Sequence, residues 1–180
     1  MISNVLKNIG RFVILVLLQV FIVKNINLGR YFIFFPYVLF ILLLPFNTSK
    51  PLTLVLAFVL GLCVDMFYDT QGMHAMACIT MAFVRSSVLE LFAPREGYDE
   101  QLKPTIAYMG VGWFSSYALI LILVHHLVLF YIEAFTFHEF FRTFLRVLGS
   151  SLATFMFIYL MQFLFYRPSS NRISWVKIRT

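Results

Sequence analysis

The 180-residue chain is 61% hydrophobic and only 12% charged, with a mean hydropathy of +0.88. These values exclude a water-soluble globular fold, since soluble domains are about 45–50% apolar and about 25% charged. The net charge of +6 does not indicate nucleic-acid binding, because the fourteen Lys and Arg residues are dispersed along the chain. We therefore expect a single all-α integral membrane domain over residues 1–180.

The apolar content suffices for five or six membrane spans of about 20 residues each. Six apolar segments stand out, at residues 10–23, 31–46, 52–68, 72–92, 105–131 and 143–166. The first is expected to be retained, because no small-x-small cleavage site follows it. Pro36 and Pro45 predict a kink and a C-terminal stop in the second. Short polar connections predict antiparallel neighbours.

Basic residues divide unequally between the two sides of this six-span arrangement. The side shared by both termini holds Lys7, Arg11, Lys50, Arg95, Lys103, Arg167, Arg172, Lys177 and Arg179. The other side holds Lys24, Arg30, Arg142 and Arg146. The positive-inside rule then places both termini in the cytoplasm, and the basic tail at 167–180 is expected to lie on anionic lipid. Aromatic residues near segment ends, such as Phe34, Phe35 and Tyr166, are expected to be interface anchors.

The third segment carries a stripe of Ala57, Gly61 and Asp65, which recur every four residues and therefore share one helix face. Small residues at this spacing let another backbone approach closely, and a carboxylate inside the membrane is costly unless it has a partner. Two interpretations remain open. The stripe contacts the transmembrane segment of a partner, or Asp65 makes a structural hydrogen bond to the fourth segment or to the short loop that ends at Gly72.

Arg85 in the fourth segment is the other intramembrane charge. A rise of about 1.5 Å per residue puts Arg85 and Asp65 about 10 Å apart in depth, so we do not expect them to pair. Arg85 is instead expected to reach the cytoplasmic interface or the region of Glu90, with a structural role.

The sequence indicates no catalytic, cofactor or metal site. His125 and His126 are adjacent, so their side chains point about 100° apart on a helix and do not form an i, i+4 ligand pair; we expect them in a belt at the outer interface. The sequence contains no H-E-x-x-H, G-x-S-x-G, P-loop or dinucleotide motif. Cys63 and Cys78 are expected to act as small hydrophobes. The chain is thus not expected to be an enzyme.

The longest predicted cytoplasmic loop, residues 93–104, begins with Ala93-Pro94, ends at Pro104 and carries charges of both signs. Exposed loops often carry recognition, so this loop is either a docking surface for a cytosolic partner or a solvated connector. Its candidate contact residues are Arg95, Glu96, Tyr98, Asp99, Glu100 and Lys103.

Two short motifs resemble the rod shape-determining protein family MreD. They are Gly61-Leu62-x-x-Asp65 in the third segment and Gly72-x-His74-Ala75 at the start of the fourth. Three later stretches are similar to the version of this family found in Bacteroidetes-type bacteria. They are residues 97–105, His125-His126 and Glu133-Ala134-Phe135.

The resemblance implies a non-enzymatic scaffold subunit of the cell-elongation machinery in the bacterial inner membrane. Such proteins pair with MreC and connect the MreB cytoskeleton to peptidoglycan synthases. It also implies six transmembrane helices in a fold similar to the vitamin-binding membrane subunits of energy-coupling-factor transporters. The alternative function is therefore a substrate-binding subunit of a vitamin transporter. Such subunits resemble one another in an Ala-x-x-x-Ala pair on the first helix, which residues 10–19 lack.

Overall fold

In a computed structural model, the described residues are all except 1, 27–28, 30, 100–102, 136–139 and 166–180. They form helices and connecting segments, with no strand among them. The long helices are α1 (Ile2–Leu17), α3 (Lys50–Tyr68), α4 (Met73–Leu91), α6 (Val111–Ala134) and α7 (Phe140–Phe165). The short elements are the π-helical turn η1 (Leu18–Ile22), the 3₁₀ turns η2 (Val23–Asn25) and η3 (Pro36–Val38), and the one-turn helices α2 (Leu39–Leu42) and α5 (Ile106–Met109). The predicted basic tail at 167–180 and Tyr166 lie outside the described residues.

Four helices in the described part of the chain are long and apolar enough to cross a membrane. They are the continuous stretch Leu6–Asn25, α3, α6 and α7. Helix α4 has the same length as α3 but carries His74, Arg85 and Glu90 and is not among the four. The protein is therefore an all-helical membrane protein, and six crossings remain a prediction.

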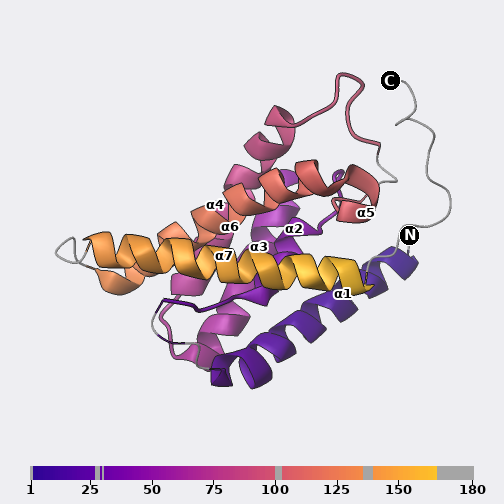
Figure 1. The fold of residues 1–180 in the computed structure, drawn as a ribbon. Coiled ribbons are helices and arrows are strands. Elements are labelled where there is room, and N and C mark those ends of the chain that lie inside the picture. Colours follow the sequence, from indigo (N-terminus) through magenta and orange to yellow (C-terminus); the bar gives the residue numbers. More distant parts are fainter. Residues whose placement is uncertain (1, 27–28, 30, 100–102, 136–139, 166–180) are drawn as a thin grey trace.

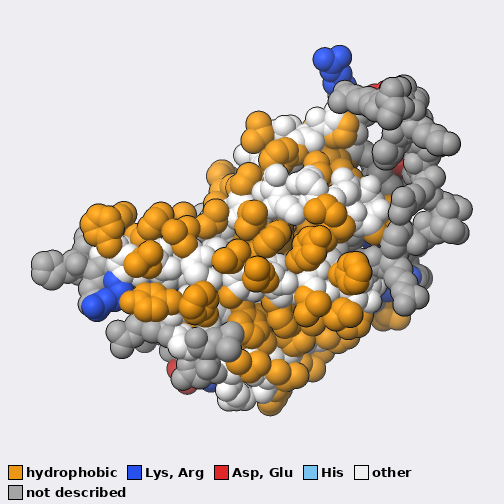
Figure 2. Space-filling model, viewed as in Figure 1, with side chains coloured by type: hydrophobic (Ala, Val, Ile, Leu, Met, Phe, Trp, Pro, Cys, Tyr) orange, Lys and Arg blue, Asp and Glu red, His pale blue; other side chains and the backbone are white. Residues whose placement is uncertain are grey.

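The helices pack in a sequence that follows the chain, since α3 packs against α4, α4 against α6, and α6 against α7. Helix α7 runs across the front of the bundle in Figure 1, and α1 lies below it. Apolar side chains cover the face seen in Figure 2, including the surfaces of α1 and α7. Large exposed side chains such as Ile14 and Leu152 are expected where a helix faces lipid.

The second predicted span does not form a continuous helix. Residues 31–35 belong to no helix or strand, and only η3 and α2 are helical before the chain turns again at Leu43. All side chains from Phe34 to Leu44 are buried, so this segment fills the centre of the bundle, and Phe34 and Phe35 are not the interface anchors we expected. Pro36 explains the break, because it lacks an N–H and keeps the preceding residue out of the helical region.

Side chains of helix α7 form hydrogen bonds with backbone groups of the irregular segment 31–35. The N–H of Ile33 donates to Ser150 Oγ at 3.1 Å, and the N–H of Phe35 donates to Thr154 Oγ1 at 3.1 Å. The Ser150 hydroxyl donates in turn to the Tyr31 carbonyl at 3.2 Å. Ser150 and Thr154 lie one helical turn apart on the same face of α7. Irregular backbone at membrane depth is tolerated where protein groups replace the missing hydrogen bonds in this way.

Candidate functional site

Asp65 links the end of α3 to the start of α4. Its carboxylate accepts hydrogen bonds from the N–H of His74 at 3.0 Å and from the N–H of Ala75 at 2.9 Å, and the Thr70 hydroxyl also donates to it. A carboxylate here satisfies N–H groups that the first turn of α4 leaves free and complements the helix dipole. Of the two interpretations kept open for Asp65, the structure therefore shows the structural hydrogen bond to the fourth segment and its preceding loop.

The small residues of the stripe let α3 and α4 touch. Ala57 and Gly61 are fully buried or nearly so. A Cβ built on Gly61 would lie 2.5 Å from the backbone N of Ala75 and 2.7 Å from the backbone C of His74. Helix α4 of the same chain thus occupies the surface that the other interpretation assigns to a partner's transmembrane segment. The turn between the helices places Asp69 and Gly72 at positive φ, 54° and 85°, which glycine adopts without strain.

Arg85 lies towards the C-terminal end of α4, away from the contact between Asp65 and the start of α4. It forms no ion pair with Asp65. It is 3% exposed and lines one cavity with Glu90, so it lies in the region of Glu90 as expected, while its position relative to the membrane interface stays a prediction. Its Nη2 donates to the Leu44 carbonyl at 2.6 Å, and its Nε donates to the Tyr117 hydroxyl at 2.9 Å. Glu90 is paired with Lys50 instead.

Arg85 belongs to a set of donors that cap the end of α2. The Tyr117 hydroxyl donates to the Leu42 carbonyl at 3.0 Å, and Arg11 Nη1 donates to the Leu43 carbonyl at 3.1 Å. Together with Arg85, these side chains serve three successive carbonyls that α2 leaves without a helical partner. This role could not be predicted from the sequence, because it depends on the interruption of the second predicted span.

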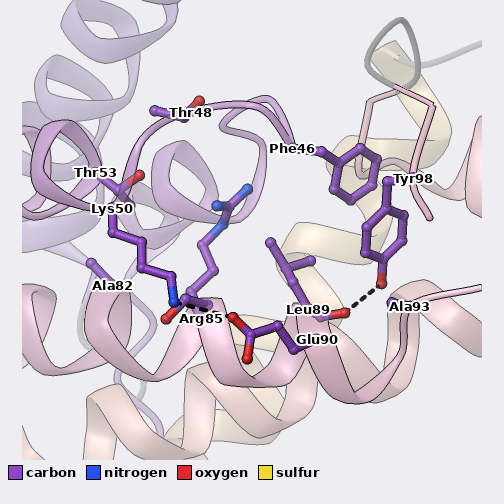
Figure 3. A pocket seen from close by; sticks show the side chains of 11 residues that line it. Phe46, Thr48, Lys50, Thr53, Ala82, Arg85, Leu89, Glu90, Ala93 and Tyr98 are labelled. Carbon is purple, nitrogen blue, oxygen red and sulfur yellow. Dashed lines mark hydrogen bonds and ion pairs between the residues drawn. The ribbon is translucent and has the colours of Figure 1, made fainter.

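A cavity of about 230 Å³ opens beside Arg85, between the first turn of α3 and the last turns of α4 (Figure 3). Its polar lining groups are those of Thr48, Lys50, Thr53, Arg85, Ser86, Glu90 and Tyr98, and its apolar walls are Phe46, Ala82, Leu89 and Ala93. Lys50 and Glu90 form an ion pair of 3.1 Å at its rim, with side chains 69% and 70% exposed. The cavity is therefore apolar on one side and positively charged at its base.

The predicted docking loop closes one side of this cavity through Tyr98. The Tyr98 ring stacks on Phe46 with centroids 4.2 Å apart, and its hydroxyl donates to the Leu89 carbonyl at 2.9 Å. Burial raises the pKa of the Tyr98 hydroxyl. Arg95, Glu96 and Asp99 are exposed, whereas Glu100 lies outside the described residues. Either role of the loop remains a prediction.

Lys103 lies close enough to two cations on α1 to be affected by them. Burial is the main cause that lowers the pKa of Lys103, and the positive charges of Arg11 and Lys7 lower it further. With Lys50 and Arg85, these side chains give the molecule a basic end, which we define as the end where α3 begins and α4 terminates.

A buried cluster of Tyr37 and three histidines lies deeper in the bundle. The Tyr37 hydroxyl is 2.8 Å from His74 Nδ1 and 2.7 Å from His125 Nε2. His126 bonds to the Ile122 carbonyl at 2.8 Å and to Thr154 Oγ1 at 3.2 Å. His125 and His126 are fully buried, so their predicted place in an interfacial belt is wrong.

Together with Thr154 of α7, this cluster joins four separate parts of the chain, the others being η3, α4 and α6. A hydroxyl carries one proton, so Tyr37 donates to one of its two histidines and accepts from the other. The Phe35 ring lies between the histidines, with centroids 5.3 Å from His74 and 5.5 Å from His126. Such a network fixes how the helices fit together, although His125 Nδ1 has no hydrogen-bond partner among the described residues. No group of three His, Cys, Asp or Glu residues in the described part of the chain is placed to hold a metal ion.

A second cavity of about 380 Å³ lies at the opposite end, where α6 ends and α7 begins. Its lining residues are Tyr31, Ile33, Glu133, Ala134, Arg142, Thr143 and Arg146. Arg146 pairs with Glu133 at 3.1 Å and lies 4.2 Å from the centroid of the Phe130 ring.

Comparison of the chain with protein-family models, with curated proteins and with solved structures finds no match.

Proposed function

We propose that the chain is a non-enzymatic scaffold subunit of the bacterial cell-elongation machinery, in the inner membrane with both termini in the cytoplasm. In this role it joins MreC to the MreB cytoskeleton and to peptidoglycan synthases. One observation carries the proposal. Gly61, Asp65, His74 and Ala75, from the two motifs that resemble the MreD family, meet in a single contact between α3 and α4.

The way the membrane-embedded polar groups are used supports this proposal. Asp65, Arg85 and Thr154 each bond to backbone groups of another segment, so their hydrogen bonds hold the fold together. A scaffold needs such a fixed shape in order to present constant surfaces to its partners. Since α4 covers the Ala57, Gly61 and Asp65 stripe, we expect the MreC helix to contact an exposed apolar face instead.

The first experiment is purification of the tagged full chain from native membranes in mild detergent, with mass spectrometry of what accompanies it. We expect to recover MreC together with a peptidoglycan synthase. Neither should be recovered from control cells that carry an untagged copy. A photo-crosslinker at the exposed Ile14 or Leu152 then maps the contact, with the buried Leu60 as the negative position. Failure to recover MreC from a preparation that retains other membrane complexes would contradict the proposal.

A second candidate is the substrate-binding subunit of a vitamin transporter. The specific observation in its favour is the cavity of about 380 Å³ at Arg142 and Arg146. This function requires an ATPase pair and a large membrane coupling subunit as partners. Their recovery in the same purification, in place of MreC, would select this candidate.

A further inference from the structure

The cavity beside Arg85 contains a buried cation that forms no ion pair with the described residues, and the one carboxylate in its lining, Glu90, is paired with Lys50. Arg85 is 3% exposed, and no carboxylate of the described residues lies within ion-pair distance of it. The acidic residues of α3 and α4 are engaged elsewhere, because Asp65 binds the start of α4 and Glu90 binds Lys50. A buried charge is costly unless it is both hydrogen-bonded and paired.

One edge of the guanidinium group is still free to bind. Nε and Nη2 make the hydrogen bonds to Tyr117, Leu44 and Pro45, whereas Nη1 makes none to the residues that the structure describes. Arg85 also lines the cavity, and Figure 3 shows its side chain extending away from α4. A guanidinium edge with unused N–H donors matches the oxygens of a phosphate or carboxylate.

The cavity walls identify the kind of anion. A volume of about 230 Å³ is below the roughly 300–1,000 Å³ of sites for drug-sized ligands. Lys50 at the rim is held only by an exposed ion pair, and such pairs are weak, so its ammonium group is available to a second anionic oxygen. Phe46, Ala82 and Leu89 provide an apolar wall. Basic pockets between helices at the cytoplasmic side of a membrane bind lipid head groups.

We infer that this cavity binds the phosphate of an anionic phospholipid head group, with Arg85 as the buried contact and Lys50 as the contact at the rim. The phosphate neutralises Arg85, and the acyl chains leave along the exposed side of α3 and α4. A free phosphate ion offers the same chemistry, so the test separates the two sources.

The test compares two adjacent serines on α4. Ser86 lines the cavity, whereas Ser87 is exposed and does not line it. Ser86→Leu fills the cavity without removing a bond made by Arg85, and Ser87→Leu is the matched control. The purified full-length chains are incubated with equal amounts of phosphatidylglycerol and phosphatidylcholine, and bound lipids are counted by native mass spectrometry. A thiol-reactive dye that reports exposure of the buried Cys78 gives the melting temperature.

Wild type and Ser87→Leu are expected to retain phosphatidylglycerol over phosphatidylcholine. Ser86→Leu should lose this preference by about fivefold or more, which corresponds to about 1 kcal/mol, with its melting temperature in the absence of lipid unchanged. Equal preference in Ser86→Leu and wild type would overturn the inference. In a third outcome, no lipid preference is found, but inorganic phosphate raises the melting temperature of wild type and not of Ser86→Leu. The cavity would then bind free phosphate, and the inference that it binds a phospholipid would be overturned.

Discussion

Gly61 is the residue at which α3 and α4 come closest, so it has little tolerance for a side chain. Gly61→Ala places a methyl group against backbone atoms of His74 and Ala75, and the two helices must separate. We expect a loss of about 1–3 kcal/mol, typical of overpacked interiors, measured as a lower melting temperature in detergent. The control is Gly112→Ala in α6, where a Cβ meets nothing within 4 Å and improved helix propensity should leave stability equal or higher. Equal effects at both glycines would contradict the close contact.

Asp65 is expected to act through acceptor oxygens rather than through size. Asp65→Asn keeps the shape but replaces one acceptor with an NH₂ group that faces the backbone N–H donors of α4. Loss of such a cap costs about 0.5–2 kcal/mol, again visible in the melting temperature. Asp69→Asn is the matched control, because Asp69 is exposed and asparagine tolerates its positive φ. A melting temperature unchanged in Asp65→Asn would show that these bonds contribute nothing to stability.

At the scale of single residues, the sequence predicted Asp65 better than Arg85. The four-residue repeat of small residues on α3 pointed to a close helix contact, and a structural bond from Asp65 to the next helix was one of its two interpretations. Arg85 binds carbonyls of a segment 40 residues earlier, and only knowledge of the broken second segment reveals that those carbonyls are free. Tyr37 and His74 meet for the same reason, so their cluster was not predicted either.

At the scale of elements, long apolar runs predicted helices well where one periodic pattern continues. Helices α3, α4 and α7 fall within a few residues of the predicted segments 52–68, 72–92 and 143–166. The segment at 31–46 is as apolar as these, yet it forms only η3 and α2. Hydropathy reports burial rather than conformation, and Pro36 together with the polar face of α7 decided the conformation.

A substitution at Thr154 tests whether α7 stabilises the irregular segment 31–35. Thr154→Val keeps the side-chain shape but removes the acceptor for the Phe35 N–H and the contact with His126. A buried N–H left without a partner costs about 1–3 kcal/mol, so the melting temperature should fall. Thr80→Val on α4 is the control, since the Thr80 hydroxyl bonds only to the Met76 carbonyl of its own helix. If both variants have the same melting temperature, the irregular segment 31–35 does not depend on α7.

At the scale of the whole molecule, the tight turn between α3 and α4 predicts that α4 crosses the membrane although it is less apolar. Single cysteines at Ser49, Gln71 and Arg95, in a chain with Cys63 and Cys78 replaced by alanine, test this topology. An impermeant maleimide added to spheroplasts should label position 71 only, and permeabilised membranes should be labelled at all three. Labelling of positions 71 and 95 from the same side would show that α4 does not cross.

The dependence of residues 31–35 on α7 also bears on how the protein is made. Their hydrogen-bonding partners Ser150 and Thr154 lie 117 and 119 residues further along the chain, so the early segment leaves the ribosome long before these partners exist. Unpaired backbone groups cannot stay in hydrocarbon. The segment must therefore wait as a helix or at the membrane surface, and pulse-labelled cells should show protease resistance of the N-terminal half only once the last helix is synthesised. Insertion of α7 then completes a structure that the earlier helices cannot form by themselves.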